Sequence, residues 1–173
     1  MYGGGRGGVN EELGKVRAEY LGSLPFDGYA IGGSLGKNSE ELFQMLNKVV
    51  PLLPRGKPNH VLGIGDELSI RACVPLGIDT FDSTFPTRSA RHGSLLTKTR
   101  GRINVRNSKF KTLFEPPCYE CVCSLCRNHS VAYLHHLDKA REPNAWTLAT
   151  EHNLHYMGTM MRELREAIAR NEV

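Results

Sequence analysis

The sequence predicts an α/β fold with parallel strands, followed by a cysteine-rich lobe and a long terminal helix. Short apolar runs that end in glycine or aspartate alternate with helical patterns up to Asp82. Three cysteines then crowd into six residues, and helical spacing of apolar residues continues almost to the end of the chain. The alternation is typical of a sheet whose parallel strands are connected by helices.

Two helices with capping signals are expected early in the chain. Asn10 caps the first, which ends before Pro25 and whose apolar residues recur at helical spacing. These residues are Leu13, Val16, Tyr20 and Leu21. Asn38 caps the second helix, Glu41 completes a capping box, and Pro51 ends it. The core-facing residues of the second helix are expected to be Leu42, Met45, Leu46 and Val49.

Three short apolar runs are expected to be the parallel strands: residues 29–31, 60–65 and 78–81. Asp66 caps a short helix between the second and third runs, and this helix ends at Gly77. Each run leads into glycine or aspartate, the last into Asp82. A glycine at such a strand end lets a flat ligand approach the backbone. The glycine-rich run over residues 3–8 is expected to be a poor strand.

These strands fit one end of a larger architecture. A (β/α)8 barrel needs eight strands and about 250 residues, and its ligands collect at the carboxyl ends of the strands. This chain has 173 residues and three expected strands. The expected fold class is therefore α/β: the last strands of an incomplete (β/α)8 TIM-like barrel with a C-terminal lobe. Either the chain is a piece of a longer protein, or a partner supplies the remaining strands.

The second half of the chain is expected to be built differently. Residues 103–105 form a strand of a small hairpin, and residues 129–141 form a helix that is broken by Pro143. A final helix is expected over residues 147–171. Its apolar stripe consists of Leu148, Met157, Met161, Leu164 and Ile168.

Charge is distributed unevenly along the chain, whose formal net charge is +4. No acidic residue lies between Asp82 and Glu115, and that interval holds eight lysines and arginines. This basic stretch contains Arg88, Arg91, Lys98, Arg100, Arg102, Arg106, Lys109 and Lys111. Such a stretch is typical of a contact with a phosphate backbone, and a solvated surface loop is the alternative interpretation.

Nothing in the sequence indicates export or a membrane. No apolar run approaches the roughly 18 residues that cross a bilayer. The glycine-rich start lacks the apolar segment of a signal peptide. A cytoplasmic location is expected, where thiols stay reduced. The five cysteines therefore require an explanation other than disulfides.

The cysteine cluster consists of Cys121, Cys123 and Cys126. Three thiols this close in sequence can converge on one tetrahedral metal ion. A fourth ligand from a separate helix would cross-link two elements, and His152 suits that position. His129 and Cys118 remain alternatives, as does a cluster of buried cysteines without metal. The mixed thiolate and imidazole set favours zinc over iron.

The cysteine cluster is one part of a longer resemblance. The Cys-x-Cys-x-x-Cys run is followed by His152 within Glu-His-Asn-Leu, and four further segments stand in a recognisable order. They are FDGYAIGG at 26–33, LGIG at 62–65, FDSTFPTRSAR at 81–91 and AYLHHL at 132–137. Together they resemble the zinc motif, base pocket and catalytic segment of the tRNA-guanine transglycosylases, the queuine tRNA-ribosyltransferases. The resemblance covers the chain from about Leu24 onward.

This resemblance implies an enzyme of tRNA base exchange, or pentosyltransferase. Guanine at the anticodon wobble position would be replaced by a 7-deazaguanine, either queuine or a precursor. Asp82 stands at the position of the family's nucleophile, which forms a covalent aspartyl-ribose intermediate. The alternative is that Asp82 merely caps the turn after its strand. The zinc is implied to be structural.

The resemblance also implies binding residues and partners. Gly33 would lie against the target base, and Leu62 and Gly63 would line its pocket, although Leu62 also fits an ordinary core position. Arg88 and Arg91 would grip the anticodon region. The implied partners are a tRNA with a wobble guanosine, a free guanine or deazaguanine base, and a second subunit in a homo- or heterodimer; no membrane is involved. The implied domains are a barrel part over residues 1–100 and a zinc-binding lobe with C-terminal helices over residues 101–173.

Three departures from the family pattern bear on activity. The upstream barrel half has no counterpart here, Arg6 precedes Gly7 and Gly8 where the family has glutamine, and the loop over residues 32–36 is one residue shorter. They predict slow exchange or none by this chain alone. The rival hypothesis is therefore a non-catalytic or truncated relative that serves as a zinc-stabilised tRNA-binding or dimerisation module. A stand-alone zinc-ribbon transcription factor would leave the strand ends unexplained.

Overall fold

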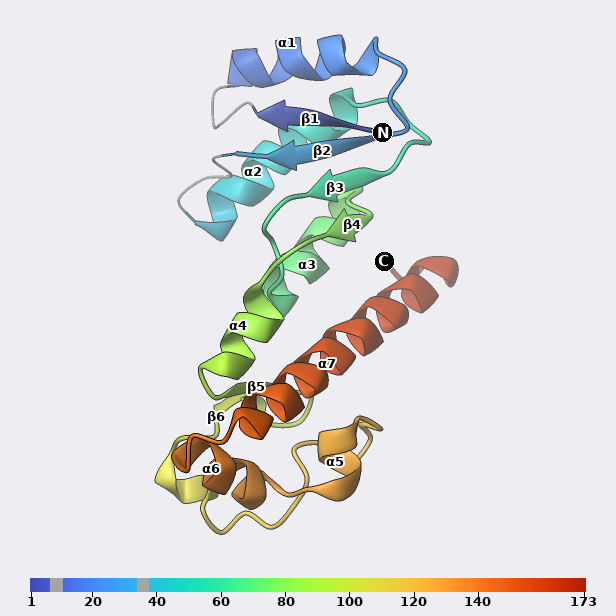
Figure 1. Ribbon diagram of the computed structural model, residues 1–173. Coiled ribbons are helices and arrows are strands. Elements are labelled where there is room, and N and C mark those ends of the chain that lie inside the picture. The colour runs from blue at the N-terminus through green and yellow to red at the C-terminus, as the bar shows by residue number, and fades with distance from the viewer. Residues whose placement is uncertain (7–10, 34–37) are drawn as a thin grey trace. The chain divides into compact units, whose positions relative to one another are not determined.

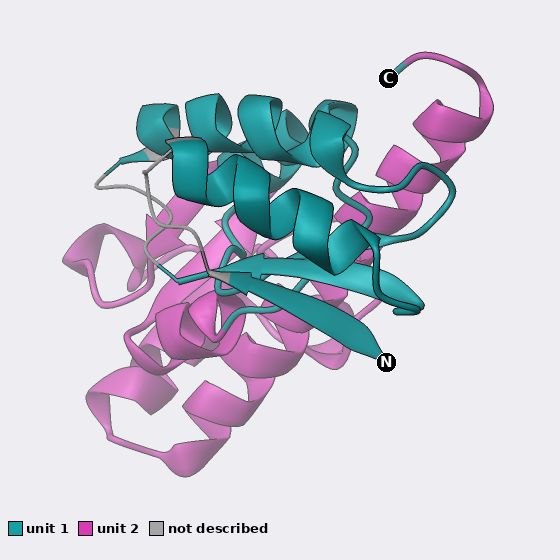
Figure 2. Ribbon diagram, turned by 90° about the horizontal axis from the view of Figure 1, so that it is seen from above, with its two compact units in different colours: residues 1–83, 173 teal, residues 84–172 magenta. Residues whose placement is uncertain are grey.

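A computed structural model describes residues 1–6, 11–33 and 38–173. The predicted cap Asn10, the glycines after Arg6 and the loop over residues 34–36 therefore lie outside the described residues. The chain forms two compact units, residues 1–83 with residue 173 and residues 84–172 (Figure 2). Residues 84–100 group with the second unit, and the expected domain division at residue 100 stays a prediction.

The first unit is a parallel α/β sheet (Figure 1). Its four strands lie in chain order: β1 (Tyr2–Arg6), β2 (Gly28–Gly32), β3 (Asn59–Val61) and β4 (Thr80–Phe81). The connecting helices are α1 (Glu11–Gly22), α2 (Ser39–Val49) and α3 (Glu67–Cys73). Short 3-10 turns, η1 (Val50–Leu52) and η2 (Val74–Leu76), extend α2 and α3. Parallel strands joined by helices in consecutive order are the repeating arrangement of a (β/α) barrel, so the predicted fold class is confirmed.

The two faces of this sheet differ in what they carry. Alternation along the strands directs Tyr29, Ile31 and Val61 to the face covered by the helices, and all three are buried in one core with residues of α1, α2 and α3. The opposite face, called here the open face, carries the alternate residues. His60 pairs in register with Thr80 on that face. The hydrophobic core and the polar pair of His60 and Thr80 therefore occupy opposite faces of the sheet.

Local capping signals were predicted correctly. The side chain of Asn38 accepts a hydrogen bond from the Glu41 N–H at the start of α2, at 2.9 Å. Asp66 accepts from the Ser69 N–H at the start of α3, at 2.9 Å. Gly77 follows the η2 turn with φ of 89°, a left-handed conformation that favours glycine.

The predicted first helix is confirmed as α1, but three of the four apolar residues that predicted it do not face the core. Leu13, Val16 and Tyr20 are exposed, whereas Ala18 is buried and Leu21 is half-buried in the core. The buried residues of α1 include the small Gly14 and Ala18, and Gly14 lies against Val49 of α2. Small residues let two helices approach closely. A search for large apolar residues at helical spacing does not identify a packing face of that kind.

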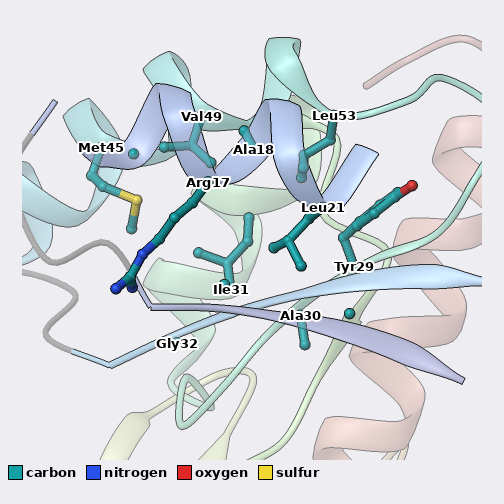
Figure 3. Close-up of a pocket in the computed structure, with 13 residues that line it drawn as sticks. Arg17, Ala18, Leu21, Tyr29, Ala30, Ile31, Gly32, Met45, Val49 and Leu53 are labelled. Atoms are coloured by element: carbon teal, nitrogen blue, oxygen red, sulfur yellow. The ribbon is translucent and has the colours of Figure 1, made fainter. Parts of the chain in front are cut away.

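The glycine-rich start was wrongly expected to be a poor strand. Residues 2–6 pair with β2 over their whole length. Gly3 is accommodated by the ring of Phe26, which lies only 2.5 Å from where a Cβ would stand. The missing side chains also leave a cavity of about 40 Å³ between the sheet and helices α1 and α2 (Figure 3). Its lining includes Gly5, Leu21 and Met45.

The second unit combines a hairpin with helices. It contains α4 (Phe85–Arg91), β5 (Ser94–Thr97), β6 (Gly101–Asn104), α5 (Ser124–Asn128), α6 (Val131–Lys139) and α7 (Pro143–Ala169). A 3-10 turn, η3 (Ser108–Phe110), follows the hairpin. Strands β5 and β6 are antiparallel, which confirms the predicted hairpin. Leu95, Val105 and Leu125 are buried in the core of this unit.

The predicted boundary between the last two helices is wrong. Ser130 caps α6 by accepting from the Tyr133 N–H, so His129 precedes that helix. Pro143 does not break a helix but begins α7, since proline is well tolerated in a first helical turn. On α7 the expected stripe is only partly buried, and Ile168 is exposed. Within the described ranges, no helix has the length and apolar character needed to cross a membrane.

Candidate functional site

The second unit brings the four predicted metal ligands together. Their ligand atoms all lie within 4.8 Å of one another: Cys121, Cys123, Cys126 and His152. The cysteines come from the loop before α5 and from α5 itself, while the histidine comes from α7. In the described part of the chain, the converging set does not include the alternatives His129 and Cys118.

The spacing of these atoms fits a tetrahedral zinc ion. The Nδ1 atom of His152 lies 3.8, 3.4 and 3.3 Å from the sulfurs of Cys121, Cys123 and Cys126. Zinc bonds of about 2.3 Å to sulfur and 2.0 Å to nitrogen at tetrahedral angles place such atoms about 3.5 Å apart. The observed distances bracket that value. The donor set and its geometry therefore suit structural zinc, with four protein ligands.

His152 is oriented for this role by its second ring nitrogen. Its Nε2 lies 2.8 Å from the carbonyl oxygen of Leu96 in β5, and the side chain is fully buried. A carbonyl only accepts, so Nε2 carries the proton and Nδ1 turns an unprotonated lone pair toward the sulfurs. The contact fixes both the ring orientation and the tautomer that a metal requires.

The thiols are coupled to one another. A hydrogen bond from Cys126 lowers the pKa of Cys123 to about 3. The same contact, followed by burial, raises the pKa of Cys126, and burial raises the pKa of Cys121. Zinc binds cysteine as the thiolate, so metal binding at this cluster releases the protons that the thiols carry.

In the first unit, the Asp82 carboxylate is anchored at the carboxyl end of β4. Its Oδ1 lies 3.1 Å from Nε2 of His60 and accepts from the Gly63 N–H at 3.2 Å. Gly63 has φ of 79°, so its backbone turns back toward Asp82 in a conformation that side chains disfavour. The Asp82 side chain is 60 % exposed, which leaves it accessible to a ligand.

The predicted pocket residues lie at the ends of the neighbouring strands. Gly33 follows β2 with φ of 96° and is exposed. Leu62 follows β3 and is 43 % exposed. Its side chain lies directly against Gly32, where a Cβ would be 2.4 Å from Leu62 Cδ1. The carboxyl ends of β2, β3 and β4 thus present glycines, an exposed apolar side chain and a carboxylate.

Comparison with known proteins decides the family. The family model for queuine tRNA-ribosyltransferase matches residues 1–173. The chain belongs to this family. It is 50 % identical over 168 residues to a queuine tRNA-ribosyltransferase of Protochlamydia amoebophila and 44 % identical over 174 residues to that of Chlamydia caviae.

The chain spans less than half the length of these relatives. The match covers 97 % of this chain but 43 % of the Protochlamydia amoebophila protein, and 100 % of this chain but 46 % of the Chlamydia caviae protein. The four-stranded sheet is accordingly part of the TIM-like barrel that the family implies.

Some residues of the predicted basic stretch, residues 88–111, are already paired with acidic side chains. Three of its residues form ion pairs inside the second unit: Lys98 with Glu163, Arg100 with Glu115, and Arg106 with Asp138. Arg88 and Arg91, the two arginines of the predicted RNA contact, lie one helical turn apart on α4 and are both exposed. These two residues share one helix face.

Sequence reasoning missed the residues beside the zinc ligand. Asn153 is fully buried: its side chain accepts from the Leu96 N–H at 2.9 Å and donates to the carbonyls of Pro86 and Ser94. Glu151 accepts from the Ser124 N–H at the start of α5, at 2.9 Å. A polar residue at a buried position of a helix is a signal for such a role, but its partners lie too far along the chain to be identified by inspection.

Proposed function

We propose that this chain carries the nucleophile of tRNA base exchange, with Asp82 forming a covalent aspartyl-ribose intermediate. The observation that carries the proposal is the anchored but exposed carboxylate at the carboxyl end of β4. That end of a parallel strand is where catalytic groups of (β/α) barrels collect. Family membership supplies the substrate class, a tRNA with a guanosine at the wobble position.

The chemistry proceeds in two displacements at the ribose C1′. A carboxylate oxygen of Asp82 bonds to C1′ while the bond from C1′ to guanine N9 breaks, and guanine leaves with a proton. The incoming 7-deazaguanine base, queuine or a precursor, then loses its ring N–H proton and bonds to C1′ while the Asp82 ester bond breaks. One N–H is exchanged for another, so the reaction needs no oxidant. A carboxylate suits both steps, because it is a nucleophile and a good leaving group.

The neighbouring strand ends support a base pocket. Gly33 has no side chain to obstruct a flat base, and Leu62 and Gly63 supply an apolar wall beside the nucleophile. The target guanine must be flipped out of its stack to reach such a pocket. Arg88 and Arg91 are proposed to bind the anticodon phosphates, since their guanidinium groups suit bidentate contacts.

The zinc site is proposed to serve the fold and not the exchange. Four protein ligands leave no open coordination position for a substrate. Its thiolate ligands require reducing conditions, which supports a cytoplasmic location.

We further propose that the protein works as a dimer of like or related subunits. Rings of His129 and Tyr133 stack at 4.7 Å, Phe114 shares a hollow with Tyr133, and Phe114 and Tyr119 are strongly exposed. Exposed aromatic side chains of this kind are enriched at protein interfaces. Sedimentation of the zinc-loaded protein tests this, and a monomer at all accessible concentrations would contradict it.

A second candidate function is a non-catalytic tRNA-binding or dimerisation module. The observation that favours it is the converging set of zinc ligands in the second unit, the unit that also carries the exposed Arg88 and Arg91. Trapping of tRNA on the protein discriminates between the two. The enzyme predicts a covalent adduct with wobble-guanosine tRNA that resists denaturation and disappears in Asp82→Ala. The module predicts that wild type and Asp82→Ala bind tRNA equally and that neither forms an adduct.

A further inference from the structure

We propose that His60, oriented by Thr80, is the positioning residue that holds one oxygen of Asp82 and leaves the other for attack. The catalytic consequence rests on the proposed function of Asp82, but the hydrogen-bonded relay itself does not. His60 belongs to none of the segments by which the sequence resembles its family.

Strand register brings the three side chains together. His60 in β3 and Thr80 in β4 are directly paired across the parallel ladder. Asp82 stands two residues after Thr80, and the alternation of strand residues returns it to the same face. Nδ1 of His60 lies 2.9 Å from the Thr80 hydroxyl, and Nε2 lies 3.1 Å from Asp82 Oδ1. The imidazole therefore bridges the two residues.

The chemistry of the partners decides which way each hydrogen bond runs. An ionised carboxylate only accepts, so His60 Nε2 carries the proton. The Thr80 hydroxyl can donate to Nδ1 of the neutral ring, which selects the Nε2–H tautomer. The ring of Tyr2 meets His60 edge-on, with centroids 6.4 Å apart, and restricts its tilt. The His60 side chain is 19 % exposed and the Asp82 side chain 60 %, so the imidazole is shielded while the carboxylate is accessible.

Both donors to Asp82 act on the same oxygen. His60 Nε2–H and the Gly63 N–H converge on Oδ1. Oδ2 receives neither, so it is the oxygen assigned to attack C1′. In the resulting ester Oδ1 is the carbonyl oxygen. When the incoming base breaks the bond between C1′ and Oδ2, negative charge returns to the carboxylate, and two donors already aimed at Oδ1 stabilise it.

This division of roles makes a specific kinetic prediction. A donor on Oδ1 makes the carboxylate a better leaving group and a somewhat weaker nucleophile. Loss of His60 therefore slows departure of Asp82 more than its attack. The covalent tRNA adduct should accumulate while base exchange slows.

The relay is tested first in the protein without substrate, by nitrogen-15 NMR of labelled histidine. We expect His60 in neutral form to show the Nε2–H tautomer, and Asp82→Ala and Thr80→Val each to give a mixture of tautomers. His155 is the internal reference and should be unaffected. A tautomer mixture in wild type, or an unchanged His60 signal in Asp82→Ala, would overturn the proposal whatever the protein does with tRNA.

The catalytic consequence is tested with His60→Ala and His60→Gln. The Gln side-chain nitrogen stands at the same number of bonds from Cα as Nε2, so it restores the donor. We expect His60→Ala to slow exchange roughly 100-fold, with little change in KM and more trapped adduct than wild type, and His60→Gln to recover most of the rate. A purely structural role predicts equal losses in both variants and less adduct. If wild type forms no adduct at all, the proposed function fails while the NMR result still decides the relay.

Discussion

The two units of this protein hold their side chains in place by different means. In residues 84–172, a metal site, three ion pairs and a fully buried asparagine tie the hairpin and helices together. In residues 1–83, the sheet depends on apolar packing against one face and begins with a glycine-rich strand beside a cavity. Asp82, the carboxylate proposed for catalysis, belongs to the first unit, residues 1–83. Rigid cross-linking and accessible chemistry are therefore assigned to separate parts of one chain.

Removal of the zinc should have the largest effect, and it should be confined to one unit. His152→Ala deletes both a ligand and the contact with Leu96, and structural zinc contributes on the order of 10 kcal/mol to small metal-dependent folds. We expect loss of stoichiometric zinc and of packing in residues 84–172. Metal analysis and thiol labelling near neutral pH measure both. His155→Ala, on the same helix, is the matched control and should keep its zinc.

The labelling pattern distinguishes the units. Cys73 in the first unit is buried, and burial, followed by the charge of Asp66, raises its pKa to about 11. In His152→Ala the three cluster thiols should therefore react while Cys73 stays protected. If Cys73 became reactive at the same rate, the two units would not be independent and the comparison would fail.

Asn153→Leu should have the next largest effect. Leucine keeps the branched shape and the number of heavy atoms of asparagine, but it removes the acceptor of the Leu96 N–H and a donor to each of two carbonyls, which costs about 2–4 kcal/mol. Urea unfolding of the zinc-loaded protein, followed by fluorescence of Trp146 on the same helix, measures the free energy of unfolding. Asn144→Leu, at an exposed position of α7, should change it by less than about 0.5 kcal/mol. Equal losses in both variants would contradict a special role for Asn153.

Arg88→Gln combined with Arg91→Gln should weaken tRNA binding by a smaller amount that depends on salt. Each exposed arginine is expected to neutralise one phosphate, so the slope of log K against log salt should shrink by roughly 0.7–0.9 per arginine. Lys98→Gln is the control, because Lys98 already pairs with Glu163 at 3.0 Å. If Lys98→Gln changed the salt slope as much per residue as the arginine substitutions do, ion pairing within the protein would not determine which basic residues contact RNA.

Gly5→Ala should give the smallest effect, and it should be stabilising. Its Cβ would stand 3.4 Å from Leu21 Cδ1, an ordinary contact, and would fill part of the cavity while restricting the unfolded chain. We expect a gain of about 0.5–1 kcal/mol. Gly3→Ala is the matched opposite, because its Cβ would meet the Phe26 ring at 2.5 Å. The rate of Cys73 labelling reports opening of the first unit, and slower labelling in Gly3→Ala than in Gly5→Ala would contradict both expectations.

Local signals predicted the parts of the structure that depend on neighbours in sequence. The caps Asn38 and Asp66 and the cysteine cluster each form within a few residues, so short patterns identify them. Strand β1 was missed because pairing with β2, over 20 residues away, overrides the poor propensity of glycine. The start of α7 was missed because proline both ends and begins helices.

The candidate site was predictable only in part for the same reason. The three cysteine ligands follow from spacing and donor chemistry, which left His129 and Cys118 open beside His152 for the fourth position. The contacts of Asn153 reach residues 57 to 67 positions away, and that of His60 depends on the register of β3 with β4. Register between strands that are separated by a helix is a property of the folded sheet, and no short segment encodes it.

The backbone of Gly63 has a consequence for how this protein can change over evolutionary time. Because a main-chain N–H and not a side chain of that loop grips Asp82, the neighbouring position 62 can vary in size without moving the carboxylate. If Asp82 acts as proposed, a larger or smaller residue at position 62 would reshape the space for a base and leave the reacting oxygen where it is. Position 63 has no such freedom, since its φ of 79° excludes nearly every other residue. Under that proposal, substrate preference can drift at one residue while the chemistry stays fixed by the next.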